Sequence, residues 1–263
     1  MMILIRGAGD IASGVAYRLH LCGYSVAMTD LPQPTSIRRT ICFSEAILNG
    51  EAQVEEVRAQ LAKSPKWAKA IMEAGTVAVL ADPEGASLQA LKPDVVVDAI
   101  LAKRNLGTRI TDAPVVIGLG PGFTAGQDCH AVVETMRGHT LGRVYYAGSA
   151  LPNTGVPGSI GGFTLERILR APCDGVFKGV KQIGDLVEAG EVCAYVDEAP
   201  IKASIRGILR GLLPDGLMVH AGMKSGDVDP RCKVEHCYQV SDKALSIAGG
   251  VLEAMLHLQR AGF

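Results

Sequence analysis

The sequence has few aromatic residues and no excess charge of either sign. Only 5% of its 263 residues are Phe, Trp or Tyr, with a single Trp at position 67, and 26 Lys and Arg nearly balance 27 Asp and Glu. Proteins that bind nucleic acid rely on basic patches and on aromatic rings that stack on bases. We therefore expect no nucleic-acid partner.

Long apolar segments free of helix breakers are also lacking. The longest uncharged run, residues 144–165, contains Pro152, Pro157 and several glycines, which would leave backbone groups unsatisfied in lipid. The apolar stretch near the N-terminus is interrupted by Arg6 and Asp10 and is shorter than the apolar part of a signal peptide. We expect no membrane partner and a cytoplasmic location.

The seven cysteines are scattered without a CxxC motif, so no disulfide framework is predicted. Cys232, His236 and Cys237 lie close together, but a structural zinc site needs four ligands in spaced pairs. We therefore predict no metal site. A contribution from distant Cys129 and His130 remains an alternative.

The N-terminal residues predict a strand, a tight turn, a helix and a second strand. Residues 2–6 are an apolar run, and apolar residues then recur at helical spacing from Ile11 to Cys22, before Gly23. Residues 25–29 form the second apolar run, which ends at Asp30 ahead of a proline-rich break. The pattern predicts a complete β-α-β unit.

The turn of this unit fits a dinucleotide-binding fingerprint, GxGxxA. Gly7 provides the tight turn, Gly9 the close approach to a phosphate, and Ala12 the packing of helix on strand. Asp30 stands where an acid accepts hydrogen bonds from a ribose hydroxyl. The predicted nucleotide-binding residues here are Gly7, Ala8, Gly9, Asp10, Ile11 and Asp30. A tight turn without a ligand is the alternative.

Further strands are predicted at residues 76–81, 94–99 and 113–118, whereas residues 44–73 have a helix-rich composition. The carboxyl ends of parallel strands meet at one rim, so Asp82, Asp98, Lys103 and Arg104 should lie there together with Gly9 and Asp30. Lys103 would face an anion. The alternative for it is a solvated helix start.

Four glycines fall within residues 118–126, after the last of these strands. Such a loop can present several backbone N–H groups to a phosphate, and Gly120 and Gly122 are its predicted contacts. It lacks the Lys-Ser/Thr ending of a P-loop, and a structural crossover remains the alternative. Asp128 and His130 follow in a predicted hairpin and are weak catalytic candidates.

The second half of the chain contains an internal repeat. Residues 171–190 align without a gap on residues 203–222, an offset of 32. The identities include Gly175 with Gly207, Gly179 with Gly211, Gly184 with Gly216, Val187 with Val219, Ala189 with Ala221 and Gly190 with Gly222. The repeat predicts a duplicated β unit whose two halves are related by symmetry.

Each copy resembles one half of a biotinyl/lipoyl domain, a small flattened β barrel. In the carrier members of that family, the modified lysine sits on a hairpin between the halves, at about the place of Val196. Lys202 is the only lysine near it and lacks the Met-Lys-Met or Asp-Lys-Ala setting of carriers. We expect no covalent biotin or lipoate.

The predicted fold is therefore α/β, a Rossmann-like parallel sheet with an inserted biotinyl/lipoyl-like β barrel. Residues 1–168 form the nucleotide-binding domain, residues 169–231 the barrel, and residues 232–263 a helix that packs back on the first domain.

Several motifs extend along nearly the whole chain: residues 6–12 (RGAGDIA), 37–40 (IRRT), 42–46 (CFSEA), 120–126 (GPGFTAG), 128–131 (DCHA) and 241–244 (SDKA). On these motifs the chain resembles the YqeB family. The resemblance implies an accessory or maturation protein of selenium-dependent molybdenum hydroxylases, with such a client as a partner. It supplies no catalytic residues.

Three functions remain open. A maturation factor would bind a pyranopterin dinucleotide or its nucleotide precursor in the Rossmann crevice, with Arg38 and Arg39 pairing to phosphate. An oxidoreductase would bind NAD, which Asp30 favours over NADP. In the third interpretation, the barrel is a non-enzymatic docking module for the client hydroxylase.

Overall fold

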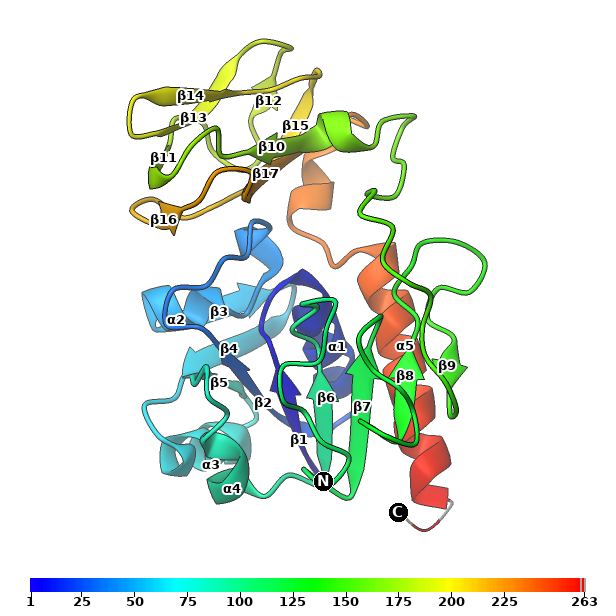
Figure 1. Ribbon diagram of the computed structural model, residues 1–263. Coiled ribbons are helices and arrows are strands. Elements are labelled where there is room, and N and C mark those ends of the chain that lie inside the picture. Colours follow the sequence, from blue (N-terminus) through cyan, green and yellow to red (C-terminus); the bar gives the residue numbers. More distant parts are fainter. Residues whose placement is uncertain (261, 263) are drawn as a thin grey trace. The chain divides into compact units, whose positions relative to one another are not determined.

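The computed structural model describes residues 1–260 and 262, which form two compact units (Figure 1). The first unit comprises the described parts of Met1–Pro34, Cys42–Thr154 and Val240–Phe263, and the second comprises Thr35–Ile41 and Gly155–Gln239. Among the described residues, no helix has both the length and the apolar character needed to cross a membrane.

The first unit is built on a nine-stranded, mostly parallel sheet in the order β3-β4-β5-β2-β1-β6-β7-β8-β9. Only the edge strands β3 and β9 run antiparallel to their neighbours. The strands are β1 (Met2–Arg6), β2 (Ser25–Asp30), β3 (Glu51–Val54), β4 (Val57–Leu61), β5 (Val77–Ala81), β6 (Val95–Asp98), β7 (Val115–Leu119), β8 (Ala131–Val133) and β9 (Val144–Tyr145). The central strands are buried on both faces, as parallel strands usually are.

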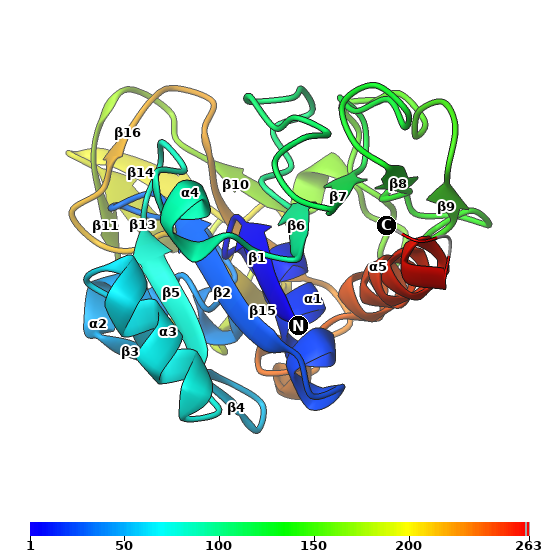
Figure 2. The ribbon, with the colours of Figure 1, turned by 90° about the horizontal axis from the view of Figure 1, so that it is seen from below.

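In the described part of this unit, five α-helices accompany the sheet: α1 (Asp10–Leu21), α2 (Glu45–Asn49), α3 (Pro65–Glu73), α4 (Ser87–Leu91) and α5 (Asp242–Arg260). Helix α5 packs along α1, as Figure 2 also shows. Gly14 makes this possible, because a Cβ at that position would lie 2.6 Å from the Cβ of Ala244. Ser241 caps the start of α5 by accepting a hydrogen bond from the Ala244 N–H at 3.1 Å.

The prediction of helix for residues 44–73 is wrong for residues 51–61. Helices α2 and α3 are present, but β3 and β4 form an antiparallel hairpin between them. Along β4 the buried residues Val57 and Ala59 alternate with exposed residues, which is the period of a strand. Glu55 begins the two-residue turn at a positive φ of 51°. Composition did not reveal this short alternation.

The second unit contains two four-stranded antiparallel sheets, ordered β10-β17-β15-β12 and β14-β13-β11-β16. Their strands are β10 (Ile168–Arg170), β11 (Gly175–Gly179), β12 (Leu186–Val187), β13 (Val192–Val196), β14 (Ala199–Lys202), β15 (Gly207–Leu212), β16 (Met218–Val219) and β17 (Lys224–Asp229). Three 3-10 turns also occur: η1 (Arg39–Ile41), η2 (Leu165–Arg167) and η3 (Val234–Cys237). The chain is thus a mixed α/β protein with a large, mostly parallel sheet and a curled antiparallel part.

The 32-residue repeat is present in the hydrogen bonds of the second unit. The Gly184 N–H donates to the Leu209 carbonyl at 2.9 Å, and its counterpart, the Gly216 N–H, donates to the Phe177 carbonyl at the same distance. The strand registers agree as well, since the pairing of β11 with β16 has the same offset as that of β15 with β12. The duplicated sequence therefore forms two halves with matching pairing.

Both halves contribute to one apolar core, in which Phe177 and its counterpart Leu209 are fully buried. We expect Phe177→Ala to lower the free energy of unfolding of the second unit by about 3–5 kcal/mol, because it removes a large side chain and leaves a cavity. The neighbouring Val176, 41% exposed, is the control. Val176→Ala should change the value by about 0.5 kcal/mol or less. Equal effects of both variants in urea denaturation would contradict this core.

Candidate functional site

The turn after β1 has a glycine where the backbone of another strand comes close. Gly7 has a φ of +98°, and a Cβ on it would lie 2.9 Å from the Ala99 carbonyl oxygen just after β6. Its N–H donates to the Thr29 carbonyl of β2 at 2.7 Å. The turn is therefore fixed between the ends of the two strands that flank β1.

Helix α1 starts directly after this turn with its first backbone donors uncapped by a side chain. Gly9 is the N-cap residue and has no side chain to accept from the first turn, and Asp10 is the first helical residue. Ala8 and Ile11 are both buried. An uncapped N-terminus of a twelve-residue helix, reached through glycine, is suited to an anion.

Asp30, at the end of β2, binds the turn itself. Its carboxylate accepts hydrogen bonds from the N–H groups of Ala8 and Leu31, both at 2.8 Å. Burial raises the pKa of Asp30, and these two hydrogen bonds oppose part of the rise. A carboxylate has about four lone-pair sites, so Asp30 retains capacity for a ribose hydroxyl.

A buried carboxylate, that of Asp98, lies at the end of β6. Asp98 is 2% exposed and accepts a hydrogen bond from the Thr108 hydroxyl at 2.6 Å, while the Arg6 guanidinium lies 3.5 Å from its carboxylate. Arg6 also donates to Thr108. Burial raises the pKa of Asp98, and the Thr108 hydroxyl, the Ile100 N–H and Arg6 oppose the rise. The contacts of Asp98 and Arg6 with Thr108 hold the loop after β6 against the sheet.

Lys103 lies in that loop at a positive φ of 63°. Burial lowers the pKa of its ammonium group, and the Glu134 carboxylate opposes part of the change. Glu134 is itself fully buried and accepts three backbone N–H groups, from Thr135, Met136 and Leu151, at 2.7–2.8 Å. Lys103, in the loop after β6, is thus within the electrostatic influence of a carboxylate that follows β8.

The two glycines of the loop after β7 are explained by contacts within the protein. A Cβ on Gly122 would lie 2.6 Å from the Arg104 Cα, and one on Gly120 would meet the Thr135 side chain. Both residues have a positive φ. The structure therefore brings the loop containing Lys103 and Arg104 against Gly122, as it brings Ala99 against Gly7. The crossover interpretation accounts for Gly120 and Gly122 without a ligand.

Asp128 and His130 are both engaged with backbone groups. Asp128 accepts from the Thr124 N–H at 2.8 Å and from the Asn105 side-chain amide at 3.4 Å. His130 accepts from the Val116 N–H through Nδ1 at 3.0 Å, and burial lowers its pKa. Nδ1 therefore binds the backbone of β7, a strand inside the sheet, which supports a structural role for this histidine.

Arg38 and Arg39 belong to the second unit. Arg38, only 5% exposed, donates to the carbonyl oxygens of His236 and Gln239 at 2.8 and 3.3 Å. Arg39 donates through Nε to the Leu212 carbonyl at 2.9 Å. These contacts hold residues 35–41 within the second unit. The pairing of both arginines with a phosphate remains a prediction.

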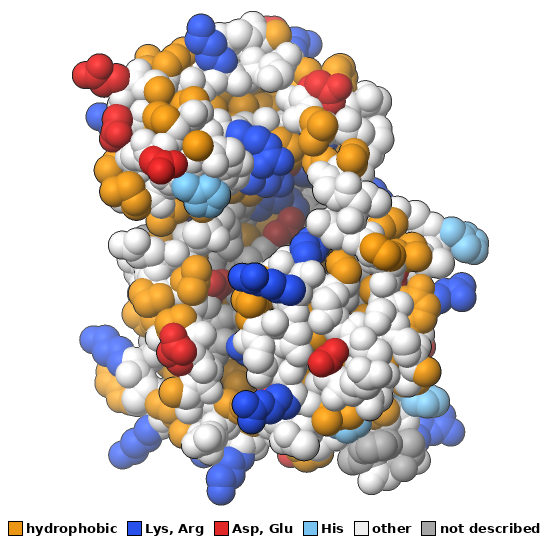
Figure 3. Space-filling model, viewed as in Figure 1, with side chains coloured by type: hydrophobic (Ala, Val, Ile, Leu, Met, Phe, Trp, Pro, Cys, Tyr) orange, Lys and Arg blue, Asp and Glu red, His pale blue; other side chains and the backbone are white. Residues whose placement is uncertain are grey.

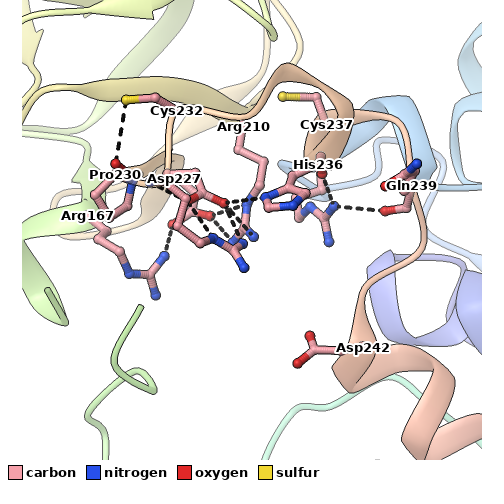
Figure 4. Close-up of polar contacts among 12 residues, drawn as sticks. Arg167, Arg210, Asp227, Pro230, Cys232, His236, Cys237, Gln239 and Asp242 are labelled. Atoms are coloured by element: carbon pink, nitrogen blue, oxygen red, sulfur yellow. Dashed lines mark hydrogen bonds and ion pairs between the residues drawn. The ribbon is translucent and has the colours of Figure 1, made fainter. Parts of the chain in front are cut away.

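The second unit contains an ion-pair network that was not predicted from the sequence (Figure 4). Asp227 and Asp229 point from β17 and are buried, with side chains 3% and 0% exposed. Arg167 donates to Asp227 at 2.6 Å, Arg210 of β15 reaches both carboxylates, and Arg231 donates to Asp229 at 2.6 Å. Two acids two residues apart on one strand share a face, and that spacing was the available signal.

The ion-pair network lowers the pKa of the Asp229 carboxyl group. Burial alone would raise the pKa of Asp229, but hydrogen bonds from Arg231 and the charges of Arg210 and Arg231 lower it to about 2. In the space-filling view, Lys and Arg side chains also gather on the face of the second unit that is drawn (Figure 3). Among residues 1–260 and 262, no three His, Cys, Asp or Glu residues are placed to hold a metal ion.

The lowered pKa of Asp229 predicts a pH dependence of stability. The folded state favours the ionised form of Asp229, so Asp229 adds to the free energy of unfolding above about pH 4. This stabilisation is lost as pH falls from about 4 to about 2. The shift corresponds to about 2 kcal/mol. Urea denaturation from pH 5 to 2 should show this loss in the wild type but not in Asp229→Asn. Glu198→Gln, in an exposed turn, should behave as wild type.

A comparison by sequence finds similarity to a protein of Escherichia coli. No protein-family model matches the chain. It is 53% identical over 261 residues to the uncharacterized protein YqeB of Escherichia coli K12, an alignment covering 99% of this chain and 48% of that protein. The chain thus spans about half the length of this curated relative.

Solved structures give only distant similarity. An ectoine utilization protein, EutE (DoeB), from Ruegeria pomeroyi matches with 12% identity and a TM-score of 0.22, over 86% of this chain and 52% of that one. An aspartoacylase family protein from Mesorhizobium loti has 11% identity and a TM-score of 0.26, over 86% and 84% of the two chains. These scores carry no functional argument. By sequence, this chain is therefore similar over nearly its whole length to about half of YqeB.

Proposed function

We propose that the first unit is a Rossmann-like domain that binds a nucleotide-containing ligand. The observation that carries this proposal is the glycine turn at Gly7–Gly9, which leads into the uncapped start of α1 and is held by Asp30. The strand order β5-β2-β1-β6-β7-β8 is the order of a dinucleotide-binding sheet. In this order the strands are added first on one side of β1 and then, from β6 onward, on its other side. A ligand phosphate would lie at the α1 N-terminus, with a ribose hydroxyl at Asp30.

We further propose that this binding serves the maturation of selenium-dependent molybdenum hydroxylases. The ligand would be a pyranopterin dinucleotide or its nucleotide precursor, and a client hydroxylase would be the partner. The similarity to YqeB supports the family but not this role, because that relative is uncharacterized. The hydrogen bonds that Asp128 and His130 accept from backbone N–H groups favour a structural role for these two residues over acid–base chemistry.

An NAD-dependent oxidoreductase is the second candidate, favoured by Asp30. A carboxylate at the end of β2 accepts hydrogen bonds from a ribose 2′-hydroxyl and repels a 2′-phosphate. Hydride exchange with bound NAD would support this candidate, whereas a preference for cytidine nucleotides or a pterin dinucleotide would support maturation.

For the second unit we propose a biotinyl/lipoyl-like barrel that acts as a docking module rather than a carrier. The matched pairing of its two halves supports this architecture. The hairpin between the halves turns at Asp197 and Glu198, and Asp197 accepts a hydrogen bond from the Val176 N–H at 3.1 Å. An acidic turn tied to the barrel occupies the region where carriers present lysine.

Gly9→Val should abolish nucleotide binding without unfolding the chain. The Gly9 backbone, with φ −76° and ψ −171°, is extended and accepts any residue, so the added side chain acts by blocking the phosphate. Calorimetry with NAD(H), NADP(H), CTP and a pterin dinucleotide measures the effect, and thermal denaturation checks the fold. Gly7 is unsuitable for this test, because a Cβ there meets Ala99. Unchanged affinity for every ligand that the wild type binds would exclude this site.

Lys202 should be unmodified in protein purified from a host with active biotin and lipoate ligases. It lies at the end of β14 rather than in the turn between the halves, so a ligase would not find it at the carrier position. Intact-mass spectrometry decides the question. An added biotinyl or lipoyl mass would show that the barrel is a carrier.

A further inference from the structure

A groove between α3 and the β3–β4 hairpin of the first unit lies outside the site described above. Its volume is about 600 Å³, within the range of sites for small molecules. Glu51 and Gln60 line it from the hairpin, and Trp67 and Ile71 from the helix.

The helical wall of the groove is apolar and aromatic. Trp67, Ala70, Ile71 and Ala74 follow one another at the spacing of a single helix face and all line the groove. Trp67 is the only tryptophan of the chain and is 55% exposed, with the Lys63 ammonium over its ring at 5.9 Å from the centroid. Large aromatic rings are usually buried, so an exposed indole held by a cation offers a surface on which a planar ring can stack.

The opposite wall is polar. Glu51 and Gln60 are direct partners in the β3–β4 pairing, so their side chains stand together on one face of the hairpin. Within residues 1–260 and 262, neither side chain has a hydrogen-bond partner. Together they offer a carboxylate that accepts two hydrogen bonds and a carboxamide that can donate one.

We propose that this groove binds a planar heteroaromatic ring with the 2-amino-4-oxopyrimidine edge, which guanine and pterin share. The ring would stack on Trp67, with its ring N–H and amino group donating to Glu51 and its carbonyl oxygen accepting from Gln60. Adenine and cytosine present an unprotonated ring nitrogen on this edge, which would face the Glu51 carboxylate without a proton between them. The groove therefore selects by the order of donors and acceptors.

The proposal is independent of the Gly7–Gly9 turn, since a nucleoside without phosphate suffices. Trp67 fluorescence, excited at the red edge of its absorption, should be quenched saturably by guanosine but not by adenosine. Inosine, which lacks the amino group, should bind about tenfold more weakly. Calorimetry with neopterin tests the second source of the same edge: binding of guanosine alone assigns the groove to guanine, and binding of neopterin alone assigns it to pterin.

Matched variants test the residues by calorimetry. Glu51→Gln and Trp67→Ala should each weaken binding of whichever ring binds the wild type by about tenfold or more, the second through loss of stacking. Glu73→Gln, exposed on the same helix, and Leu48→Ala, 42% exposed at the end of α2, should leave affinity unchanged. Gly9→Val should also bind normally, which separates this proposal from the proposed function. Binding of neither ring, equal binding of guanosine and adenosine, or unchanged affinity in Glu51→Gln or Trp67→Ala would overturn the proposal.

Discussion

The close approach of Gly7 to the backbone of Ala99 is the constraint on which the carboxyl edge of the first unit depends. It requires a residue without a side chain at a positive φ, and it sets the turn that starts α1. Asp30 then fixes the same turn from β2, while Asp98 and Thr108 fix the loop that carries Lys103. Asp30 and Asp98 both stand at the ends of parallel strands that flank β1, so the sheet fixes the positions from which these two side chains hold the turn and the loop.

The second unit shows how a duplicated sequence can retain its backbone pairing while its chemistry diverges. The counterparts of Arg210 and Asp227, 32 residues earlier, are Lys178 and Tyr195, so the ion-pair network exists in one half only. Arg231 lies beyond β17 and has Ala199 at the corresponding place, whereas Asp229 has an acid, Asp197, as its counterpart. The two halves therefore share their backbone pairing and one acid, and the substitutions at positions 210, 227 and 231 confine the ion pairs to one half.

Sequence reasoning succeeded where the signal was local. The β1–α1–β2 unit and the end of β2 at Asp30 follow from apolar periodicity and a glycine turn, and the repeat predicted the matched pairing in the second unit. It failed where a residue's neighbour is distant in sequence. Nothing near Gly122 indicates that Arg104 packs on it, and nothing near Arg38 indicates that residues 236 and 239 supply its acceptors.

The acidic residues of the first unit differ in their hydrogen-bond partners, and this difference bears on what the protein does. Asp98 and Asp128 hold loops, and Glu134 has both carboxylate oxygens occupied by backbone donors. Asp30 also accepts a backbone N–H on each carboxylate oxygen, but only one on each, whereas Oε1 of Glu134 accepts two. The remaining lone pairs of Asp30 could accept a ribose hydroxyl in the proposed site. In the proposed nucleotide site, Asp30 would bind the ribose and the uncapped start of α1 would bind the phosphate, with Lys103 in the neighbouring loop. The hydrogen bonds of these acids to backbone groups favour ligand binding over proton transfer as the proposed function of this edge of the sheet.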